Sequence, residues 1–201
     1  MTRKKLSPQA LAFIEAVRNG DTSKVTSMLD GGADPNTHED SHPVLHLAVF
    51  NGHLTVARLL IAAGADVMAY DSSYATAFHA AVYKCYFKIA EELLDAGADI
   101  NAARNPGYSS TPLHGAIWQD VREGGSERVS FLLRRGADAN CRAYVGIGKV
   151  TEQGDAVAQA LSMPDNKGAD LANLIANWSQ KDAGLRSVGR RAQGDKKRFK
   201  L

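Results

Sequence analysis

Residues 41–65, SHPVLHLAVFNGHLTVARLLIAAGA, hold two short apolar segments separated by the turn sequence Asn51-Gly52-His53. We expect Val44 to Phe50 and Leu54 to Ala63 to form helices, because their apolar residues recur at helical spacing. Gly64 then ends the second helix, as glycine commonly does. Neither helix is long enough to be stable alone in water. The unit must therefore pack against other units of the same kind.

The triplet Gly-Ala-Asp recurs along the chain and measures the length of this unit. It begins at residues 32, 64, 97 and 136, so successive copies lie 32, 33 and 39 residues apart. A second marker, an aromatic or aliphatic residue followed by histidine, occurs at Leu45-His46, Phe78-His79 and Leu113-His114. A period of about 33 residues that contains a turn and two helices is typical of an ankyrin repeat.

The chain resembles the ankyrin-repeat family in its motifs as well as in its period. The resemblance rests on Thr111-Pro112-Leu113-His114, on Asn51-Gly52-His53 and on the sequence GADIN at 97–101, and it covers about residues 6–180. It implies an all-α ankyrin-repeat solenoid of helix-turn-helix units with hairpin-like finger loops. Repeat scaffolds of one fold serve many functions, so the resemblance predicts the architecture and leaves the partner open.

The markers divide the chain into a basic disordered start, a repeat domain and a basic disordered tail. We expect the repeat domain to comprise an N-terminal capping repeat, three internal repeats and a degenerate C-terminal cap. The expected boundaries are 1–7 for the start, 8–180 for the repeat domain and 181–201 for the tail. Within the repeat domain the units are 8–38, 39–70, 71–103, 104–142 and 143–180.

The fourth unit is longer than the others in two places. Its finger loop at Ala102 to Ser110 has about two extra residues, and about four extra residues stand around Asp120 to Gly125. Insertions in repeat proteins map to surface loops, so we expect the second one to form a polar bulge between the helices. Tolerated drift explains such lengthening equally well, because loop closure depends weakly on length. In the third unit Cys85 replaces the turn glycine, which should cost a little if the position needs a positive φ.

The last part of the repeat domain has a helical stripe of its own. Leu171, Leu174, Ile175 and Trp178 recur at i, i+3, i+4 and i+7, which predicts a final helix. We expect another helix at about residues 155–163, and we expect Trp178 to pack on the fourth repeat.

Charge is unevenly distributed along the chain. The tail has eight basic and two acidic residues, a net charge of +6, and Arg3 to Lys5 add +3. Because the whole chain has a net charge of +2, the part between carries about −7. The repeat domain is therefore an acidic scaffold with basic ends, which argues against nucleic-acid binding by the scaffold itself.

Several features favour a cytoplasmic monomer. The two cysteines, Cys85 and Cys141, lie in different units without metal-ligand spacing, as reduced thiols of a cytosolic protein do. The N-terminus has no apolar stretch of the secretory type, and no apolar run is long enough to span a bilayer. The sequence KKRFK at 196–200 resembles a nuclear-import patch, so a nuclear location follows if the protein is eukaryotic or acts inside a host cell.

No constellation of residues indicates catalysis. His46, His79 and His114 share one register, but consecutive repeats place them about 10 Å apart, which is too far for one metal ion. The resemblance implies instead that these histidines bond to neighbouring backbone. The chain has no nucleophile elbow, phosphate loop or metalloprotease motif. We therefore expect no enzyme activity, no cofactor and no metal.

Aromatic residues mark the candidate binding surface. The resemblance places this concave surface at the finger tips and at the exposed end of each first helix. Phe50, Tyr83 and Trp118 share that register in three consecutive repeats, and we call them the aromatic ladder. Rigid exposed aromatics are typical of interface hot spots. The alternative is that the adjacent finger loops partly bury the rings, which would make the ladder structural.

Further residues extend the candidate surface. The positions next to the ladder are Asn51, Lys84 and Gln119, and the predicted finger-tip contacts are Asp40, His42, Tyr74 and Tyr108. Glu39 and Asp40 make the first finger acidic, which would suit a partner with a basic edge.

The sequence thus predicts a non-enzymatic protein–protein interaction module that binds a partner in its concave aromatic groove, as an adaptor, inhibitor or effector. The alternative is an adaptor associated with nucleic acid or chromatin, whose tail supplies the affinity through electrostatic contacts. The tail residues that would do so are Arg190, Arg191, Lys196, Lys197 and Arg198. A third interpretation is that the tail is only solvated.

Overall fold

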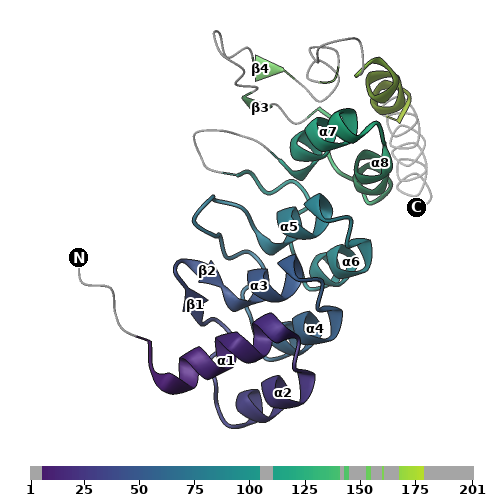
Figure 1. Ribbon diagram of the computed structural model, residues 1–201. Coiled ribbons are helices and arrows are strands. Elements are labelled where there is room, and N and C mark those ends of the chain that lie inside the picture. Colours follow the sequence, from purple (N-terminus) through teal and green to yellow (C-terminus); the bar gives the residue numbers. More distant parts are fainter. Residues whose placement is uncertain are drawn as a thin grey trace, which may run out of the picture.

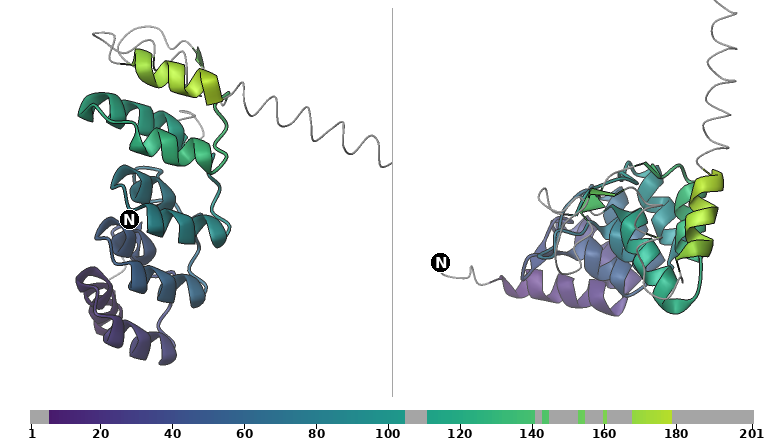
Figure 2. Two further views of the ribbon diagram at one scale, coloured as in Figure 1. Left: turned by 90° about the vertical axis from the view of Figure 1, so that its right-hand side faces the viewer. Right: turned by 90° about the horizontal axis from the view of Figure 1, so that it is seen from above.

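The computed structural model describes residues 6–104, 111–140, 143–144, 153–154, 160 and 168–178. Eight named helices stack in pairs into an elongated solenoid, and a further helical segment at 169–178 follows them (Figures 1 and 2). The predicted all-α solenoid is confirmed. The helices are α1 (Pro8–Asn19), α2 (Thr22–Asp30), α3 (Val44–Phe50), α4 (Leu54–Ala62), α5 (Ala77–Tyr83), α6 (Phe87–Asp95), α7 (Pro112–Glu123) and α8 (Glu127–Arg134).

The helices form two layers. The first helices, α1, α3, α5 and α7, make one column beside the finger loops, and α2, α4, α6 and α8 make the other (Figure 1). Strands β1 (His38–Glu39) and β2 (His42–Pro43) pair antiparallel in the first finger, with His38 opposite Pro43. A second short antiparallel pair, β3 (Ala143–Tyr144) and β4 (Gln153–Gly154), follows the fourth repeat.

Local sequence explains where the helices begin and end. Ser7 accepts a hydrogen bond from the Ala10 amide at 3.1 Å, and Pro8 occupies the first position of α1. The expected helix at Val44 to Phe50 is confirmed, and α4 ends one residue earlier than expected, at Ala62. Gly64 follows with φ +91°, a left-handed conformation that glycine adopts without strain.

The core runs between the two columns and passes without interruption from repeat to repeat. Each first helix buries its marker residue, so Leu45, Phe78 and Leu113 are almost fully inaccessible. The second helices α4, α6 and α8 contribute deeply buried leucines, among them Leu60, Leu93 and Leu132. Since no helix pair could bury this apolar surface alone, stacking is what makes each unit stable.

Side-chain amides join consecutive repeats outside the core. Asn36 accepts a hydrogen bond from the Asp66 amide at 2.8 Å, and Asn101 accepts one from the Asp138 amide at 2.9 Å. At the equivalent junction in between, the Asp99 amide donates to the Met68 sulfur at 3.3 Å. Sulfur is a weaker acceptor than an amide oxygen, so this junction has the weaker polar link.

The extra residues of the fourth repeat do not form the predicted polar bulge. They lengthen the first helix instead, so α7 has 12 residues where α3 and α5 have 7. The added sequence has no helix-breaking residue until Gly124, which ends α7 with φ +75°. Asp120 lies in the extension and is buried, because it faces α8 and finds a partner there. The lengthened finger at 102–110 lies largely outside the described residues.

The helical segment 169–178 covers the end of the stack. Leu171 and Ile175 are buried, and Trp178 is partly buried and packs against the core. A Cβ atom on Gly168 would lie 1.7 Å from the Ala160 carbonyl oxygen, so only glycine fits at the start of this segment. The predicted helix at 155–163, apart from Ala160, and the segments 1–5 and 179–201 lie outside the described residues.

Candidate functional site

The aromatic ladder lies on one face of the solenoid and is exposed. Phe50, Tyr83 and Trp118 each follow the N-cap residue of their helix by seven positions, so they come at the same point of α3, α5 and α7. Their exposed fractions are 53%, 50% and 44%. About half of the surface of each of these residues is therefore open to solvent.

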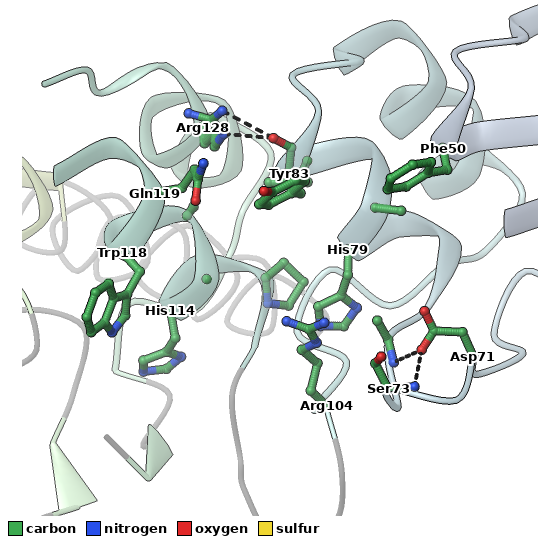
Figure 3. Close-up of a pocket in the computed structure, with 16 residues that line it drawn as sticks. Phe50, Asp71, Ser73, His79, Tyr83, Arg104, His114, Trp118, Gln119 and Arg128 are labelled. Atoms are coloured by element: carbon green, nitrogen blue, oxygen red, sulfur yellow. Dashed lines mark hydrogen bonds between the residues drawn. The ribbon is translucent and has the colours of Figure 1, made fainter. Parts of the chain in front are cut away.

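A groove of about 510 Å³ runs along this face (Figure 3). It lies between the first helices and the second and third fingers, and all three ladder residues line it. The other lining residues are Asp71, Ser73, Ala75, His79, Ala80, Val82, Arg104, Pro112, His114, Gly115, Ala116, Gln119 and Arg128.

Small residues give the groove its depth. The position three residues before each ladder aromatic is Leu47 in α3, Ala80 in α5 and Gly115 in α7. Residues three apart on a helix lie on the same face, so each of these positions lies beside the aromatic ring of its own helix. Side-chain volume at this register falls from leucine to alanine to glycine, and only the last two positions line the groove. The groove is therefore open towards the fourth repeat.

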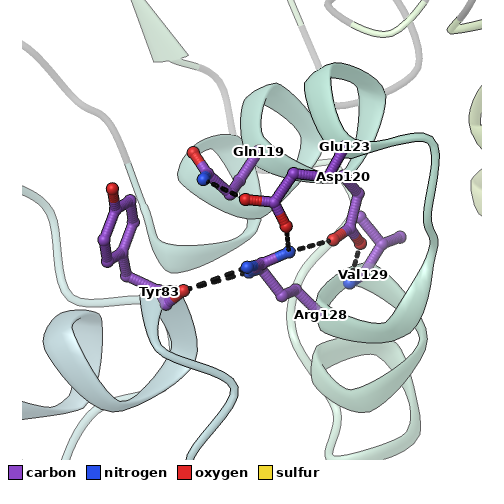
Figure 4. A network of polar contacts seen from close by, with 6 residues as sticks. All are labelled: Tyr83, Gln119, Asp120, Glu123, Arg128 and Val129. Atoms are coloured by element: carbon purple, nitrogen blue, oxygen red, sulfur yellow. Dashed lines mark hydrogen bonds and ion pairs between the residues drawn. The ribbon is translucent and has the colours of Figure 1, made fainter.

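An internal network holds the backbone beneath Tyr83 (Figure 4). Arg128, at the start of α8, donates to the Tyr83 carbonyl oxygen from Nε at 3.2 Å and from Nη2 at 3.1 Å. Its Nη1 binds Asp120 Oδ1 at 2.9 Å and Glu123 Oε2 at 2.8 Å. Asp120 Oδ2 also accepts from the Val129 amide at 2.9 Å, which satisfies a free N–H in the first turn of α8. The third and fourth repeats are thus joined through a buried charge pair.

Charge states in this network follow from its contacts. Burial disfavours the charged guanidinium, but hydrogen bonds to Asp120 and Glu123 outweigh it, so the pKa of Arg128 is raised. Hydrogen bonds from Gln119 and then from Arg128 lower the pKa of Glu123. Both shifts favour the charged forms of Arg128 and Glu123, which their ion pair requires. Sequence reasoning missed this network, although Asp120 followed eight residues later by Arg128 was there to be noticed.

The positions next to the ladder make contacts within the protein. Lys84 Nζ lies 4.1 Å from the centroid of the Phe50 ring, a cation–π contact between adjacent repeats. Asn51 donates to the Arg18 carbonyl oxygen at 3.4 Å, and Gln119 donates to Glu123. Of these three predicted contact residues, only Gln119 lines the groove.

The three predicted finger-tip residues that the structure describes do not line the groove. Tyr74 is exposed and adopts φ +55°, and neither it nor Asp40 nor His42 lines the groove. His42 Nε2 contacts Ser72 Oγ at 3.2 Å, which joins the first two fingers. Tyr108 and the tail residues Arg190, Arg191, Lys196, Lys197 and Arg198 lie outside the described residues.

The first finger is less acidic than the sequence suggests. Glu39 forms an ion pair with Arg18 at the end of α1, and this pair offsets one of the two acidic charges. The inference that a basic partner edge fits there loses much of its basis. Arg18 occupies in the first repeat the register that the ladder occupies in the next three, so the ladder does not continue to the N-terminal end.

The marker histidines serve the backbone and the helix caps. His46 Nε2 contacts the Ala75 carbonyl oxygen at 2.8 Å, as the resemblance implies. His79 and His114 contact the N-cap hydroxyls of Thr76 and Thr111 at 2.9 and 2.8 Å. A search of the described residues finds no group of three or more histidine, cysteine or acidic side chains that could hold a metal ion. None of the described helices is long and apolar enough to cross a membrane.

Comparisons with known proteins agree with this architecture. A family model described as ankyrin repeats (3 copies) matches residues 13–104, and one described as ankyrin repeats (many copies) matches residues 78–133. Zygote-specific protein 3 of Chlamydomonas reinhardtii is 35% identical over 71 residues. That match covers 35% of this chain and 19% of the relative, so the chain spans about a fifth of that protein's length.

Proposed function

The chain belongs to the ankyrin-repeat family, whose repeats are generally protein–protein interaction modules, and from this premise we propose that it binds a protein partner in the groove through the aromatic ladder. The observation that carries the proposal is the half-exposed state of Phe50, Tyr83 and Trp118 along one open groove. Exposed apolar side chains gathered along one groove commonly mark a protein–protein interaction site.

The energetic argument favours a partner with a substantial interface. Each aromatic side chain buries about 150–250 Å² when it is covered, and buried apolar area contributes about 25 cal/mol per Å². About half of each ladder residue is already covered in the free protein, so a partner would bury roughly half of that area. A single central aromatic that is a hot spot then contributes about 1–4 kcal/mol to binding. The same substitution should affect the stability of the free protein much less, because the rings are not part of the core.

The surroundings of the ladder reduce the entropy lost on binding. Arg128 holds the backbone of Tyr83, and Lys84 lies over Phe50. Side chains and backbone that are ordered before association lose less freedom when the partner arrives. The role as adaptor, inhibitor or effector depends on the partner, and all three roles would use the same surface. The proposal involves no catalysis, in keeping with a family that is typically non-enzymatic.

Affinity capture tests the proposal. Wild type, the triple variant Phe50→Ala/Tyr83→Ala/Trp118→Ala and a variant ending at Gln180 are used to capture partners from nuclease-treated source lysate. Leu11→Ala/Tyr70→Ala is the matched control, because it removes exposed side chains that do not line the groove. Circular dichroism first checks that each variant folds. The captured protein is then purified, and its Kd for each variant is measured by calorimetry.

We expect wild type, the control and the shortened chain to bind the same partner, and the triple variant to lose it. Equal affinity of the triple variant and the wild type would contradict the proposal. Capture that disappears with nuclease or with residues 181–201 would favour the alternative in which the tail binds nucleic acid.

A further inference from the structure

The groove is lined by the aromatic ladder on the helices and by the charged side chain of Arg104 on the third finger. The geometry points to a partner segment in which a bulky apolar side chain enters between Tyr83 and Trp118 and a neighbouring carboxylate binds Arg104. This inference rests on the proposed function and specifies the chemistry of the partner.

Gly115 makes the aromatic end a receptor for a side chain. It lies on α7 three residues before Trp118, and a Cβ atom added to it would meet nothing within 4 Å. The space beside Trp118 is therefore unfilled, and Ala80 on the preceding repeat leaves similar room beside Tyr83. In the second repeat the equivalent Leu47 occupies this room. A total volume of about 510 Å³ is within the range of pockets that hold compact ligand groups.

Arg104 supplies the charge that selects the neighbouring group. It is exposed at the start of the third finger, and in the view of Figure 3 it lies between the side chains of His114 and Ser73. The Arg104 side chain makes no hydrogen bond or ion pair with any other residue that the structure describes. Guanidinium groups bind carboxylates by paired hydrogen bonds, so an acidic residue in the partner fits this side of the groove.

The other charged groups of the groove already have partners. Asp71 Oδ1 accepts from the Ser73 and Ala75 amides at 2.8 and 2.9 Å and so shapes the second finger. Arg128 is buried and divides its donors among Asp120, Glu123 and Tyr83. Arg128 is already paired and Asp71 is held by amides of its own finger, so Arg104 is a lining charge that an acidic segment can bind, even though the repeat domain as a whole is acidic.

A random peptide library tests this specificity directly. Displayed peptides of about twelve residues are selected on wild type and counter-selected on Gly115→Leu, which restores at this register the side chain found at Leu47. Because Gly115 is helical and its Cβ direction is open, the leucine variant should fold at least as well as wild type. Gly115→Ala is the matched control, since it adds the same helix propensity but leaves most of the space.

We expect the enriched peptides to contain an aromatic or large aliphatic residue with an aspartate or glutamate within two positions. Their affinity should fall about tenfold or more on Gly115→Leu and should change little on Gly115→Ala. Arg104→Glu should weaken them about threefold to tenfold at low salt, and Arg104→Gln should have an intermediate effect. Matched peptides with lysine in place of the acidic residue should bind Arg104→Glu better than wild type.

Three outcomes would overturn the inference. Peptides enriched in lysine or arginine instead of acidic residues would show that Arg104 does not select the occupant. Equal binding to wild type and Gly115→Leu would show that the space beside Trp118 is not used, and absence of enrichment would show that no such segment binds. If the captured partner is lost in the ladder triple variant but is unaffected by Gly115→Leu and Arg104→Glu, the proposed function stands and only this inference fails.

Discussion

The second and fourth repeats are tied to their predecessors at the same place by different chemistry. In the second repeat an imidazole makes this contact: His53 Nε2 lies 2.9 Å from the Arg18 carbonyl oxygen. In the fourth repeat, the guanidinium of Arg128 binds the carbonyl oxygen of Tyr83. Tyr83 occupies in the third repeat the position that Arg18 occupies in the first. Each contact satisfies a carbonyl at the end of a first helix.

The two solutions differ in what fails when they are broken. The His53 contact is exposed and involves one ring nitrogen, so its removal leaves a carbonyl that water can reach. The Arg128 contact depends on a charge pair in which the side chains of Arg128 and Asp120 are only 8% and 1% exposed. A buried charge that loses its partner is far more costly than an exposed hydrogen bond. In the fourth repeat, which has the longer α7, the contact to the preceding repeat therefore contributes more to stability than the His53 contact does in the second repeat.

The largest expected effect comes from breaking the charge pair. Arg128→Met should lower the free energy of unfolding by about 3–5 kcal/mol, because Asp120 stays buried without its partner. Urea denaturation of the full chain measures this change. The double variant Arg128→Met/Asp120→Leu should be less destabilised than the single one, and a double variant with the full sum of both losses would mean that the two charges act independently. Glu123→Gln, which alters only the exposed end of the network, is the matched control.

A smaller effect is expected on the other side of the comparison. His53→Ala should lower the free energy of unfolding by about 1 kcal/mol, the usual contribution of one partly exposed hydrogen bond. The same denaturation experiment measures it. A loss as large as that of Arg128→Met would show that the two ties do not differ in the way their burial indicates.

The turn residue next to each tie offers a third test. Cys85 adopts φ +57°, where the first, second and fourth repeats have glycine, so the condition for the predicted cost is met. Cys85→Gly should raise the free energy of unfolding by about 1 kcal/mol. The reverse change Gly52→Cys should lower it, because Gly52 has φ +76° and its Cβ would lie 3.0 Å from the Tyr86 ring. Thermal unfolding of both variants checks the signs, and opposite shifts are the expected outcome.

The smallest effect concerns pH and compares the two marker histidines. Burial lowers the pKa of His46 from the ordinary 6.5, although its contact with the Ala75 carbonyl opposes this. His114 has the Thr111 hydroxyl on Nδ1, whereas in the second repeat Pro43 stands at that N-cap and Nδ1 of His46 has no partner among the described residues.

Since the folded state favours neutral His46, its contribution to stability is fully present above pH 6.5 and is lost as pH falls through the lowered pKa. The slope for one site is at most about 1.4 kcal/mol per pH unit. Unfolding of wild type and His46→Gln between about pH 8 and pH 5 measures it, and we expect the variant to have a shallower decline. Parallel curves would assign the acid sensitivity to other groups.

Much of the fold was predictable because the repeat makes each residue informative about its equivalents. The Gly-Ala-Asp spacing and the markers at Leu45 and Phe78 predicted the helix pairs, and the register of Phe50 and Tyr83 predicted where the aromatics lie. Whether the extra residues near Asp120 would loop out or continue a helix depended on a partner eight residues away in sequence. An arginine in the helix ERVSFLLR normally faces solvent, so the sequence pattern alone favoured exposure for Arg128.

The pocket beside Trp118 was also hidden, for a different reason. Its volume comes from the absence of a side chain at Gly115. That absence becomes informative only when Gly115 is compared with the equivalent residues Leu47 and Ala80. Arg104 lies on a finger and not on the helices that carry the aromatic ladder, and the repeat pattern does not indicate that it lines the same groove. The binding roles of the ladder and of Asp40, His42, Tyr74 and Tyr108 stay predictions.

The junction that involves the Met68 sulfur should differ from the other two junctions in the hydrogen-exchange rate of its aspartate amide. The Asp66 and Asp138 amides donate to asparagine oxygens, whereas the Asp99 amide donates to a thioether. Deuterium should therefore replace the proton of Asp99 sooner than those of its two counterparts, although all three occupy the same place in the repeat. The exchange rates of these three aspartate amides thus report how often each pair of neighbouring repeats separates.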